Sequence, residues 1–297
     1  MSVYPDHLRE EIESYLEGMR FCREESIEGL QEAMRYSLLA GGKRIRPVLA
    51  LATARAIGID QHEVLPLAGA IELIHTYSLI HDDLPAMDDD ELRRGRPTCH
   101  VEFGESVAIL AGDGLYAEAF RHLLTHQRSP AERVIAAAAE LASATGVNGM
   151  VGGQYLDVKE GAPTGPAGLR RLHELKTGRL IGASVICVLL LGGVHEPATM
   201  AFGRFATELG VLFQIVDDIL DVTGTDDALG KPRGSDERHG KHTYVSEFGI
   251  DRAKELAAES HRTAREALSL IAHLDEVRPY APTELEQITD FIYTRTS

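Results

Sequence analysis

Two acidic clusters are the residues whose types and spacing most clearly suggest chemistry. The first lies in residues 75–94, HTYSLIHDDLPAMDDDELRR, where acids at 82–83 and 88–91 precede Arg93 and Arg94. The second is QIVDDILD at residues 214–221. Carboxylates suit Mg²⁺, which takes one or two of them and completes its shell with water and phosphate oxygens. Because no His/Cys pair with ligand spacing lies nearby, the clusters argue against zinc.

The second cluster gathers its polar residues on one helical face. They are spaced i, i+3, i+4 and i+7, and they are Gln214, Asp217, Asp218 and Asp221. Carboxylates about 6 Å apart repel each other by roughly 2–3 kcal/mol per pair at an effective dielectric constant of 20. Cations must offset this repulsion, unless the cluster is only a solvated acidic face.

The first cluster contains Pro85, which makes a continuous helix through it unfavourable. On a continuous helix Asp82 and Asp88 would lie about 240° apart. A bulge formed by Leu-Pro-Ala-Met would instead let Asp88 swing back toward Asp82. The alternative is a charged turn that ends the helix. Because two aspartate sets follow apolar helices in one chain, we predict a shared cavity that binds Mg²⁺.

Basic residues that could hold phosphates occur at isolated, well-spaced positions. Each one alone is typical of a solvated side chain, and the argument rests on the set. GGKRIRP is not a P-loop, because the GxxxxGK[ST] spacing is missing. The candidates are Lys43, Arg44 and Arg46 in GGKRIRP, Arg93 and Arg94 after the first acids, Lys176 in KTG and Lys231 in LGK.

Helical periodicity recurs from end to end, and alternating apolar/polar runs are nearly absent, so the elements that position these residues should be helices. We predict an all-α fold with about ten helices, in which a central helix is surrounded by others. Expected helix signals are a stop at Gly41-Gly42, a start at Pro47, a stop at Gly58, an N-cap at Ser129 before Pro130, and a capping box between Thr283 and Glu286. Residues 161–168 and 223–242 should be loops.

The whole chain indicates one folded domain over residues 1–297, since no composition shift marks a boundary. A formal net charge of −16 disfavours nucleic acid and anionic membranes. The apolar stretch at 180–194 is shorter than the roughly 20 residues that cross a bilayer, so we predict no membrane span. The acidic N-terminus is unlike a signal peptide, and the three cysteines show no framework spacing. A cytoplasmic location fits best.

The motifs as a set resemble the trans-isoprenyl diphosphate synthases, and most closely the bacterial type of farnesyl diphosphate synthase. The resemblance covers nearly the whole chain, and DDLPAMD with LRRG is its most specific part. The motifs occur in family order: GGKRIRP, the segment from 74 to 100, AILAGD, GGQYLD, KTG, FQIVDDILD and LGK. The resemblance implies a helical bundle with a large central cavity between the two aspartate motifs, and a homodimer.

The resemblance also implies a head-to-tail condensation of isopentenyl diphosphate with dimethylallyl or geranyl diphosphate. Three Mg²⁺ ions, with Mn²⁺ as a substitute, would be held by Asp82, Asp88 and Asp217, supported by Asp83, Asp218 and Asp221. The allylic diphosphate would be held by Arg93, Lys176, Lys231 and Lys241. Isopentenyl diphosphate would be held by Lys43, Arg46, His75 and Arg94. Thr177 and Gln214 would flank the carbocation.

Product length should depend on the helix before the first aspartates. At 1.5 Å per residue, Tyr77 lies about 7.5 Å before Asp82 along the helix axis. Ser78 lies about one turn before Asp82. An aromatic residue at this depth, together with the Pro85-Ala86 insertion, goes with a C15 product in the family. We therefore expect farnesyl diphosphate, with geranylgeranyl diphosphate as the alternative. Tyr77 could also serve core packing.

Three other functions are disfavoured. A terpene cyclase usually carries (N,D)xx(S,T)xxxE in its second motif, and FQIVDDILD stands there instead. A catalytically silent regulatory subunit usually lacks one aspartate motif. A non-enzymatic metal binder with EF-hand spacing is not indicated, and it would leave the basic residues unexplained.

Overall fold

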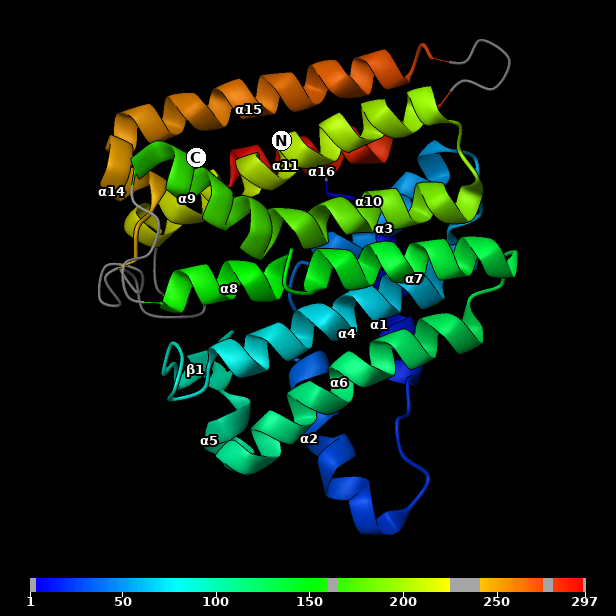
Figure 1. Cartoon of the computed structure of the whole chain (residues 1–297), viewed down its shortest axis with the longest axis vertical. Helices are drawn as coiled ribbons and strands as arrows, with labels where there is room; N and C mark the ends of the chain where they lie inside the picture. Colours follow the sequence, from blue (N-terminus) through cyan, green and yellow to red (C-terminus); the bar gives the residue numbers. More distant parts are fainter. Residues whose placement is uncertain (1–3, 160–164, 225–240, 275–279, 296–297) are drawn as a thin grey trace.

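The structure is a computed structural model that describes residues 4–159, 165–224, 241–274 and 280–295. Long helices lie side by side in it, and a two-stranded hairpin is the one sheet among the described residues (Figure 1). The predicted all-α class is confirmed. The described residues form more helices than the ten or so expected, because they include short ones such as Cys99–Phe103 and Tyr244–Phe248.

The helices and strands follow each other along the whole chain. The α-helices are α1 (Asp6–Gly18), α2 (Glu28–Leu38), α3 (Ile45–Ala56), α4 (Leu65–Asp82), α5 (Cys99–Phe103), α6 (Glu105–His126), α7 (Ala131–Thr145), α8 (Met150–Val158), α9 (Gly165–His173), α10 (Arg179–Gly192), α11 (Glu196–Thr223), α14 (Tyr244–Phe248), α15 (Ile250–Ile271) and α16 (Thr283–Thr294). The 3-10 helices are η1 (Glu25–Ile27) and η2 (Gln61–Val64), and η3 (Glu174–Gly178) is a π-helix. Strands β1 (Leu92–Arg93) and β2 (Arg96–Pro97) pair antiparallel.

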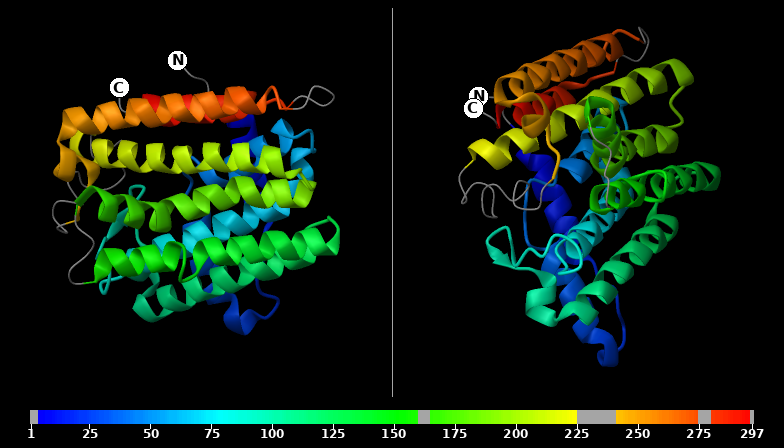
Figure 2. Two further views of the ribbon diagram at one scale, coloured as in Figure 1. Left: turned by 45° about the horizontal axis from the view of Figure 1, so that its top comes forward. Right: turned by 60° about the vertical axis from the view of Figure 1, so that its left-hand side comes forward.

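Helix α10 has the central place that its composition predicts. It packs on α3, α7 and α11, and α11 packs in turn on α15 (Figures 1 and 2). Helix α4 packs along α6 and is buried on most of its surface. Phe202 and Phe205 of α11 are among the largest fully buried side chains. The bundle therefore holds the C-terminal end of α4 and the second half of α11 in fixed positions.

Several predicted helix signals are shifted or wrong. Helix α3 begins at Ile45, before Pro47, and α7 is preceded by Pro130 instead of Ser129. Helix α16 already includes Thr283 and has no side-chain cap, so the predicted capping box is wrong. A capping box between Thr243 and Ser246 opens α14 instead. The predicted loop at 161–168 is helical from Gly165 onward, and the rest of it lies outside the described residues.

A buried ion pair joins the start of α3 to the middle of α4. Arg44 adopts a left-handed backbone conformation, with φ of 51°, and its guanidinium points into the bundle. It donates to Glu72 at 2.5 Å and to Glu13 at 2.8 Å. The side chains of Arg44 and Glu72 are only 1% and 2% exposed. The buried guanidinium of Arg44 therefore anchors the fold.

We expect Glu72→Ala to lower the free energy of unfolding by about 3–5 kcal/mol, because it leaves the Arg44 guanidinium buried without its main partner. Urea or thermal unfolding of the variant would measure the loss. Glu13→Ala is the matched control. Glu13 contacts the same guanidinium but is 25% exposed, so water can replace it and the loss should be smaller. Equal losses in both variants would contradict this account of the ion pair.

Three described helical stretches are long and apolar enough to cross a membrane by length and composition alone. They are residues 61–82, 131–158 and 165–192. In the fold much of each stretch is covered by other helices, with 61%, 44% and 56% of the three windows buried. Their apolar character is thus accounted for by packing in the bundle, and the absence of a membrane span stays a prediction.

Candidate active site

The turn after α4 brings Asp82 and Asp88 of the first acidic cluster together. Helix α4 ends at Asp82, and the chain then turns through Pro85. The backbone N–H of Asp88 donates to the carbonyl of Asp82 at 2.9 Å, and that of Asp89 donates to Leu84 at 3.1 Å. The predicted bulge is confirmed, and both Asp82 and Asp88 line one cavity.

Helix α11 carries the second motif but divides its aspartates between two environments. Asp217 and Asp221 line the cavity together with Gln214. Asp218 is 1% exposed and is turned into the protein. Its carboxylate accepts hydrogen bonds from the Tyr244 backbone and from the Gln214 amide, both at 2.7 Å. Asp218 therefore orients Gln214, whereas Asp217 and Asp221 can reach a ligand.

The cavity between these motifs has a volume of about 750 Å³, and we call it the aspartate cavity. This is within the usual range for sites that enclose a small-molecule ligand. It brings together most residues predicted from the sequence. Those lining it are Arg46, His75, Tyr77, Ser78, Asp82, Asp88, Arg93, Arg94, Lys176, Thr177, Gln214, Asp217, Asp221 and Lys241. Lys231, also predicted, lies outside the described residues.

Two lysines of the aspartate cavity are held by carboxylates. Lys176 Nζ lies 2.6 Å from Asp157, and Lys241 Nζ lies 2.8 Å from Asp88. The wide π-helical turn of η3 presents Lys176 and Thr177 to the cavity. A Cβ atom on Gly153 would lie 2.2 Å from the backbone nitrogen of Lys176, so only glycine lets α8 pack this closely on η3. The position of Lys176 is therefore fixed from two sides.

Asp83, predicted to support the metal ligands, lies behind the aspartate cavity. Its side chain is buried, it does not line the aspartate cavity, and its carboxylate accepts from Arg93 Nε at 2.8 Å. Asp83 therefore positions the Arg93 guanidinium, which does line the cavity. Its supporting role at a metal site stays a prediction.

A second, basic cavity of about 680 Å³ adjoins the aspartate cavity and shares Arg46, His75 and Arg94 with it. Lys43 also lines it, as predicted. Arg46 Nε is buried and has no hydrogen-bond partner among the described residues. Burial lowers the pKa of His75 well below its usual value, and the nearby Arg46 and Arg94 lower it further. Neutral His75 and several cations thus surround a space suited to an anion.

The glycine pair of GGKRIRP determines where Arg94 lies. Arg94 donates a hydrogen bond to the carbonyl of Gly41. A Cβ atom on Gly42 would lie only 2.6 Å from Arg94 Cζ, and the Gly42 backbone has φ of +120°. Any other residue at 42 would therefore displace the guanidinium. Gly41 also has positive φ, but a Cβ atom there would meet open space.

Three functional candidates were not assigned from the sequence. Arg295 lines both cavities and lies 3.1 Å from Asp217. Asp157 holds Lys176, and the side chain of Gln154 projects into the aspartate cavity with neither its oxygen nor its nitrogen paired in the described part of the chain. GGQYLD contains both Gln154 and Asp157 at a suitable spacing and could have identified them. No comparable local signal marks Arg295.

Two polar side-chain oxygens on the wall of the aspartate cavity are joined by a hydrogen bond. Thr177 Oγ1 donates to Gln214 Oε1 at 2.9 Å, and both residues line the aspartate cavity. The Gln214 amide is held by Asp218, so its oxygen keeps one orientation. The role of Thr177 and Gln214 beside a carbocation stays a prediction.

The donor set fits Mg²⁺ in the way expected for a phosphate-bridged ion. No group of three or more His, Cys, Asp or Glu side chains within the described ranges is close enough to hold a metal ion by itself. Mg²⁺ does not require such a group, because one or two carboxylates plus phosphate oxygens and water complete its shell. Burial raises the pKa of Asp82 to about 6, opposed by Lys176 and reinforced by Asp88. A bound cation would offset this cost of burying the carboxylate.

The wall of the aspartate cavity below Asp82 is aromatic. Tyr77 lines the cavity and is 9% exposed. Its ring packs edge-on against Tyr116 of α6, with centroids 5.0 Å apart. Tyr116 packs in the same way on Phe120 at 5.3 Å, so further rings lie behind Tyr77. Tyr77 therefore both closes the cavity and packs in the core.

Comparisons with known proteins agree with this geometry. A family model described as Polyprenyl synthetase matches residues 27–275. A farnesyl diphosphate synthase of Geobacillus stearothermophilus is 48% identical over 79% of this chain and 81% of that protein. A chloroplastic geranylgeranyl pyrophosphate synthase of Capsicum annuum is 47% identical over 80% of this chain and 66% of that protein. A crystal structure of a Helicobacter pylori geranyltransferase complexed with magnesium and isoprenyl diphosphate has a TM-score of 0.87 at 32% identity, covering 97% of this chain and 96% of that chain.

Proposed function

We propose that this chain, which belongs to the polyprenyl synthetase family of prenyltransferases, condenses isopentenyl diphosphate head-to-tail with dimethylallyl and geranyl diphosphate. The observation that carries the proposal is the adjacency of two cavities, one with aspartates and cations and the other with cations and a neutral histidine. Two anionic substrates could lie there with their reacting carbon atoms toward each other.

The aspartate cavity suits the allylic diphosphate. Arg93, Lys176 and Lys241 surround Asp82 and Asp88 and would take the oxygens of that diphosphate. Each of these cations has a carboxylate partner, so its position is set before substrate binds. Cations fixed in advance stabilise negative charge without reorganisation when the C–O bond breaks. Lys231 stays a prediction for the same diphosphate.

The basic cavity suits isopentenyl diphosphate. Lys43, Arg46 and Arg94 line it, and the unpartnered Arg46 Nε is a donor that a diphosphate oxygen would satisfy. Neutral His75 could donate one further hydrogen bond from its ring without adding charge. Because Arg46, His75 and Arg94 also line the aspartate cavity, the two substrates would be held close together.

The reaction then needs no protein nucleophile. The allylic C1–O bond breaks and its electron pair goes to the diphosphate, while Thr177 and Gln214 direct oxygens toward the allylic cation. The alkene of isopentenyl diphosphate forms the new bond from its C4 to that C1. A proton is lost from C2, and the released diphosphate accepts it. Charges balance within the two substrates.

Mg²⁺ would be held by Asp82, Asp88 and Asp217, with Asp221 nearby, and when bound it supplies positive charge where the diphosphate leaves. We propose three ions, with Mn²⁺ as a substitute. The Helicobacter pylori structure, which was determined in complex with magnesium, supports the use of this metal in the family.

We propose farnesyl diphosphate as the product, because Tyr77 closes the aspartate cavity and Tyr116 lies behind it. Geranylgeranyl diphosphate is the second candidate, since many similar proteins, including that of Capsicum annuum, are geranylgeranyl pyrophosphate synthases. We also propose a homodimer, supported by exposed apolar side chains such as Leu110 and Leu124 on α6 and Ile135 on α7. A cytoplasmic location stays a prediction from the sequence.

Incubation with Mg²⁺, radiolabelled isopentenyl diphosphate and one allylic primer at a time tests the function. Dimethylallyl and geranyl diphosphate should both give a labelled C15 product, and farnesyl diphosphate should accept almost no label. Efficient extension of farnesyl diphosphate to C20 would replace the C15 proposal with the C20 one. Absence of label from every product would refute both.

We expect Gly42→Ala to raise the KM for isopentenyl diphosphate roughly tenfold or more, because the new Cβ atom displaces the Arg94 guanidinium and a charge-assisted hydrogen bond to the substrate is lost. Steady-state kinetics with the allylic substrate saturating would measure it. Gly41→Ala is the control, because it also puts a side chain on a residue with positive φ but meets open space. An equal rise in KM for the control would assign the effect to backbone strain instead of Arg94.

A further inference from the structure

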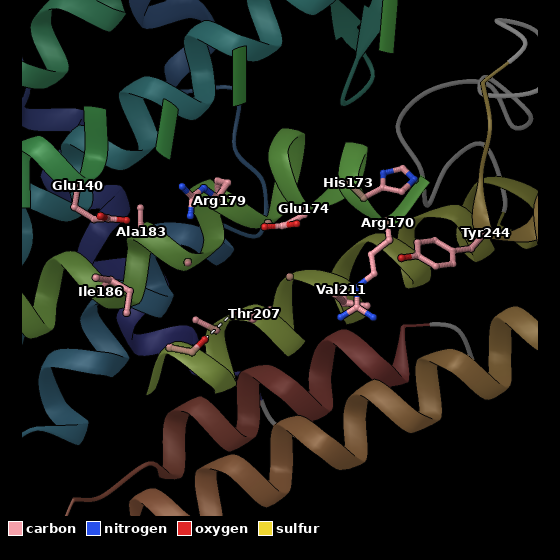
Figure 3. Close-up of a pocket in the computed structure, with 15 residues that line it drawn as sticks. Glu140, Arg170, His173, Glu174, Arg179, Ala183, Ile186, Thr207, Val211 and Tyr244 are labelled. Atoms are coloured by element: carbon pink, nitrogen blue, oxygen red, sulfur yellow. Dashed lines mark hydrogen bonds between the residues drawn. The ribbon is translucent and has the colours of Figure 1, made fainter. Parts of the chain in front are cut away.

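A third cavity lies between α10 and α11 and shares no lining residue with the aspartate or basic cavities. We call it the α10–α11 cavity. Its volume is about 420 Å³, which is enough for a small organic ligand. Residues of α7, α9, η3 and α14 complete its walls (Figure 3). The condensation reaction uses none of its lining residues.

His173 at one end of the α10–α11 cavity is buried without partners. It is only 9% exposed, and neither Nδ1 nor Nε2 has a hydrogen-bond partner among the residues described. Its ring stacks on Tyr244 with centroids 5.5 Å apart. Burial lowers the pKa of His173 to about 4, so near neutral pH the ring offers one N–H donor and one acceptor. Leaving such groups unpaired costs about 1–3 kcal/mol, which a polar ligand would recover.

The same end of the cavity carries one cation, Arg170, beside His173. Figure 3 shows Arg170, His173 and Tyr244 grouped together, with Arg179 farther along the cavity. Arg179 Nε is buried and unpartnered within the described part of the chain. The Glu174 carboxylate is paired with Arg171 at 3.0 Å. An anionic head group would find donors from Arg170 and His173 here, whereas Arg179 lies closer to Ala183 in Figure 3.

The opposite end carries apolar side chains and is kept open by a glycine. Ala183 and Ile186 lie there in Figure 3. A Cβ atom on Gly182 would meet no heavy atom within 4 Å, and its backbone is helical, so neither packing nor conformation requires glycine. Glycine inside a helix costs about 1 kcal/mol relative to alanine. Its effect is to leave space in the cavity, while Glu140 at this end disfavours a second anionic group.

We propose that the α10–α11 cavity binds a small amphiphile with a single anionic head, either a carboxylate or a phosphate monoester. The head lies against Arg170 and His173, and the apolar chain lies along Gly182 toward Ile186. This site is separate from the substrate sites. Such an occupant would provide partners for the two ring nitrogens of His173. Its chain would fill the space beside Gly182.

Occupancy of the cavity is coupled to the active site through two connections. Helix η3 contributes Glu174 and Gly178 to the α10–α11 cavity, and Lys176 and Thr177 to the aspartate cavity. Tyr244 places its ring in the α10–α11 cavity while its backbone holds Asp218.

From Asp218 the hydrogen bonds continue to Gln214 at 2.7 Å and from there to Thr177 at 2.9 Å. A ligand that fixes His173 and Tyr244 therefore acts on the residues beside the allylic cation. This coupling rests on the proposed function.

Binding is tested by calorimetric titration of the full chain, without substrates, using decanoate and decyl phosphate as separate probes. The expected result is saturable binding of at least one probe. Decan-1-ol, which lacks the anionic head, and sebacate, which has a carboxylate at each end, should bind at least tenfold more weakly. Binding of decan-1-ol as tight as that of both anions would overturn the anionic-head assignment. Failure of both anions to bind would overturn the site.

Gly182→Leu and Gly182→Ala form the matched pair of variants. Both improve helix propensity, but only leucine fills the cavity. Binding should be retained in Gly182→Ala and weakened at least tenfold in Gly182→Leu. Arg170→Gln, a change at the exposed rim, should also weaken anion binding and does not depend on how the leucine packs. Unchanged binding in both Gly182→Leu and Arg170→Gln would place the ligand elsewhere and contradict the proposal.

Steady-state kinetics test the coupling. With geranyl and isopentenyl diphosphate as substrates, the binding probe should change kcat at least twofold and leave both KM values unchanged, and Gly182→Leu should abolish this response. A rise in KM alone would indicate competition at a substrate site and would refute the coupling, as would an unchanged kcat. Because the binding titration contains no substrate, failure of the proposed condensation would leave its result interpretable.

Discussion

Asp82→Ala should reduce kcat by roughly 10³-fold or more, which corresponds to about 4 kcal/mol of lost transition-state stabilisation. Asp82 ends α4, lies beside Asp88 through the turn at Pro85, and faces the cations of the aspartate cavity. Its removal takes away a proposed metal ligand at the point where diphosphate charge would develop. Single-turnover rates with geranyl and isopentenyl diphosphate would measure the effect on the bond-forming step.

Asp89→Asn is the matched control for Asp82→Ala. Asp89 belongs to the same acidic segment, but it is exposed and does not line the aspartate cavity. Its backbone has φ of 51°, a conformation that asparagine tolerates well. The control should therefore keep activity within a few-fold of the unmodified protein. Near-normal activity of Asp82→Ala, or an equal loss in the control, would refute the metal-ligand assignment.

Tyr77→Ala should shift the main product from C15 to C20 or longer. The ring of Tyr77 closes the aspartate cavity below Asp82, and its removal opens space for at least one more five-carbon unit. Tyr116 lies behind it at 5.0 Å and becomes the next barrier. Product analysis by chromatography after prolonged incubation with excess isopentenyl diphosphate would show the distribution.

The Tyr116→Ala variant tests whether Tyr116 limits product length only after the Tyr77 ring has been removed. Tyr116 does not line the aspartate cavity while Tyr77 is present, so this change alone should leave the product length unaltered. The double variant should give products longer than those of Tyr77→Ala. An unchanged C15 product from Tyr77→Ala would show that another element limits chain growth. The buried Tyr77 ring also packs in the core, so thermal unfolding should confirm that each variant is folded.

The parts of the site that could be predicted are those fixed by local chain geometry. Pro85 interrupts α4 within a run of acids, and a turn there returns Asp88 to Asp82. The spacing in QIVDDILD likewise placed Asp217 and Asp221 on one face of α11. Both inferences need only the helical repeat and the properties of proline.

The parts that could not be predicted depend on packing between distant segments. GGKRIRP contains three cations that look equivalent in the sequence. In the structure Arg44 has a left-handed backbone conformation, and its side chain points into the bundle toward Glu72. Asp83 and Asp218 are adjacent to cavity-facing aspartates, yet each is turned toward a partner from another element. Arg295 meets Asp217 from 78 residues away. No local pattern encodes these contacts.

Carbon connectivity in the product tests the central claim most directly. The purified chain would be incubated with Mg²⁺, geranyl diphosphate labelled with ¹³C at C1 and isopentenyl diphosphate labelled with ¹³C at C4, and the product examined by NMR. The account predicts a one-bond ¹³C–¹³C coupling, because the two labelled carbons form the new bond. A product without this coupling, or no product at all, would contradict the account.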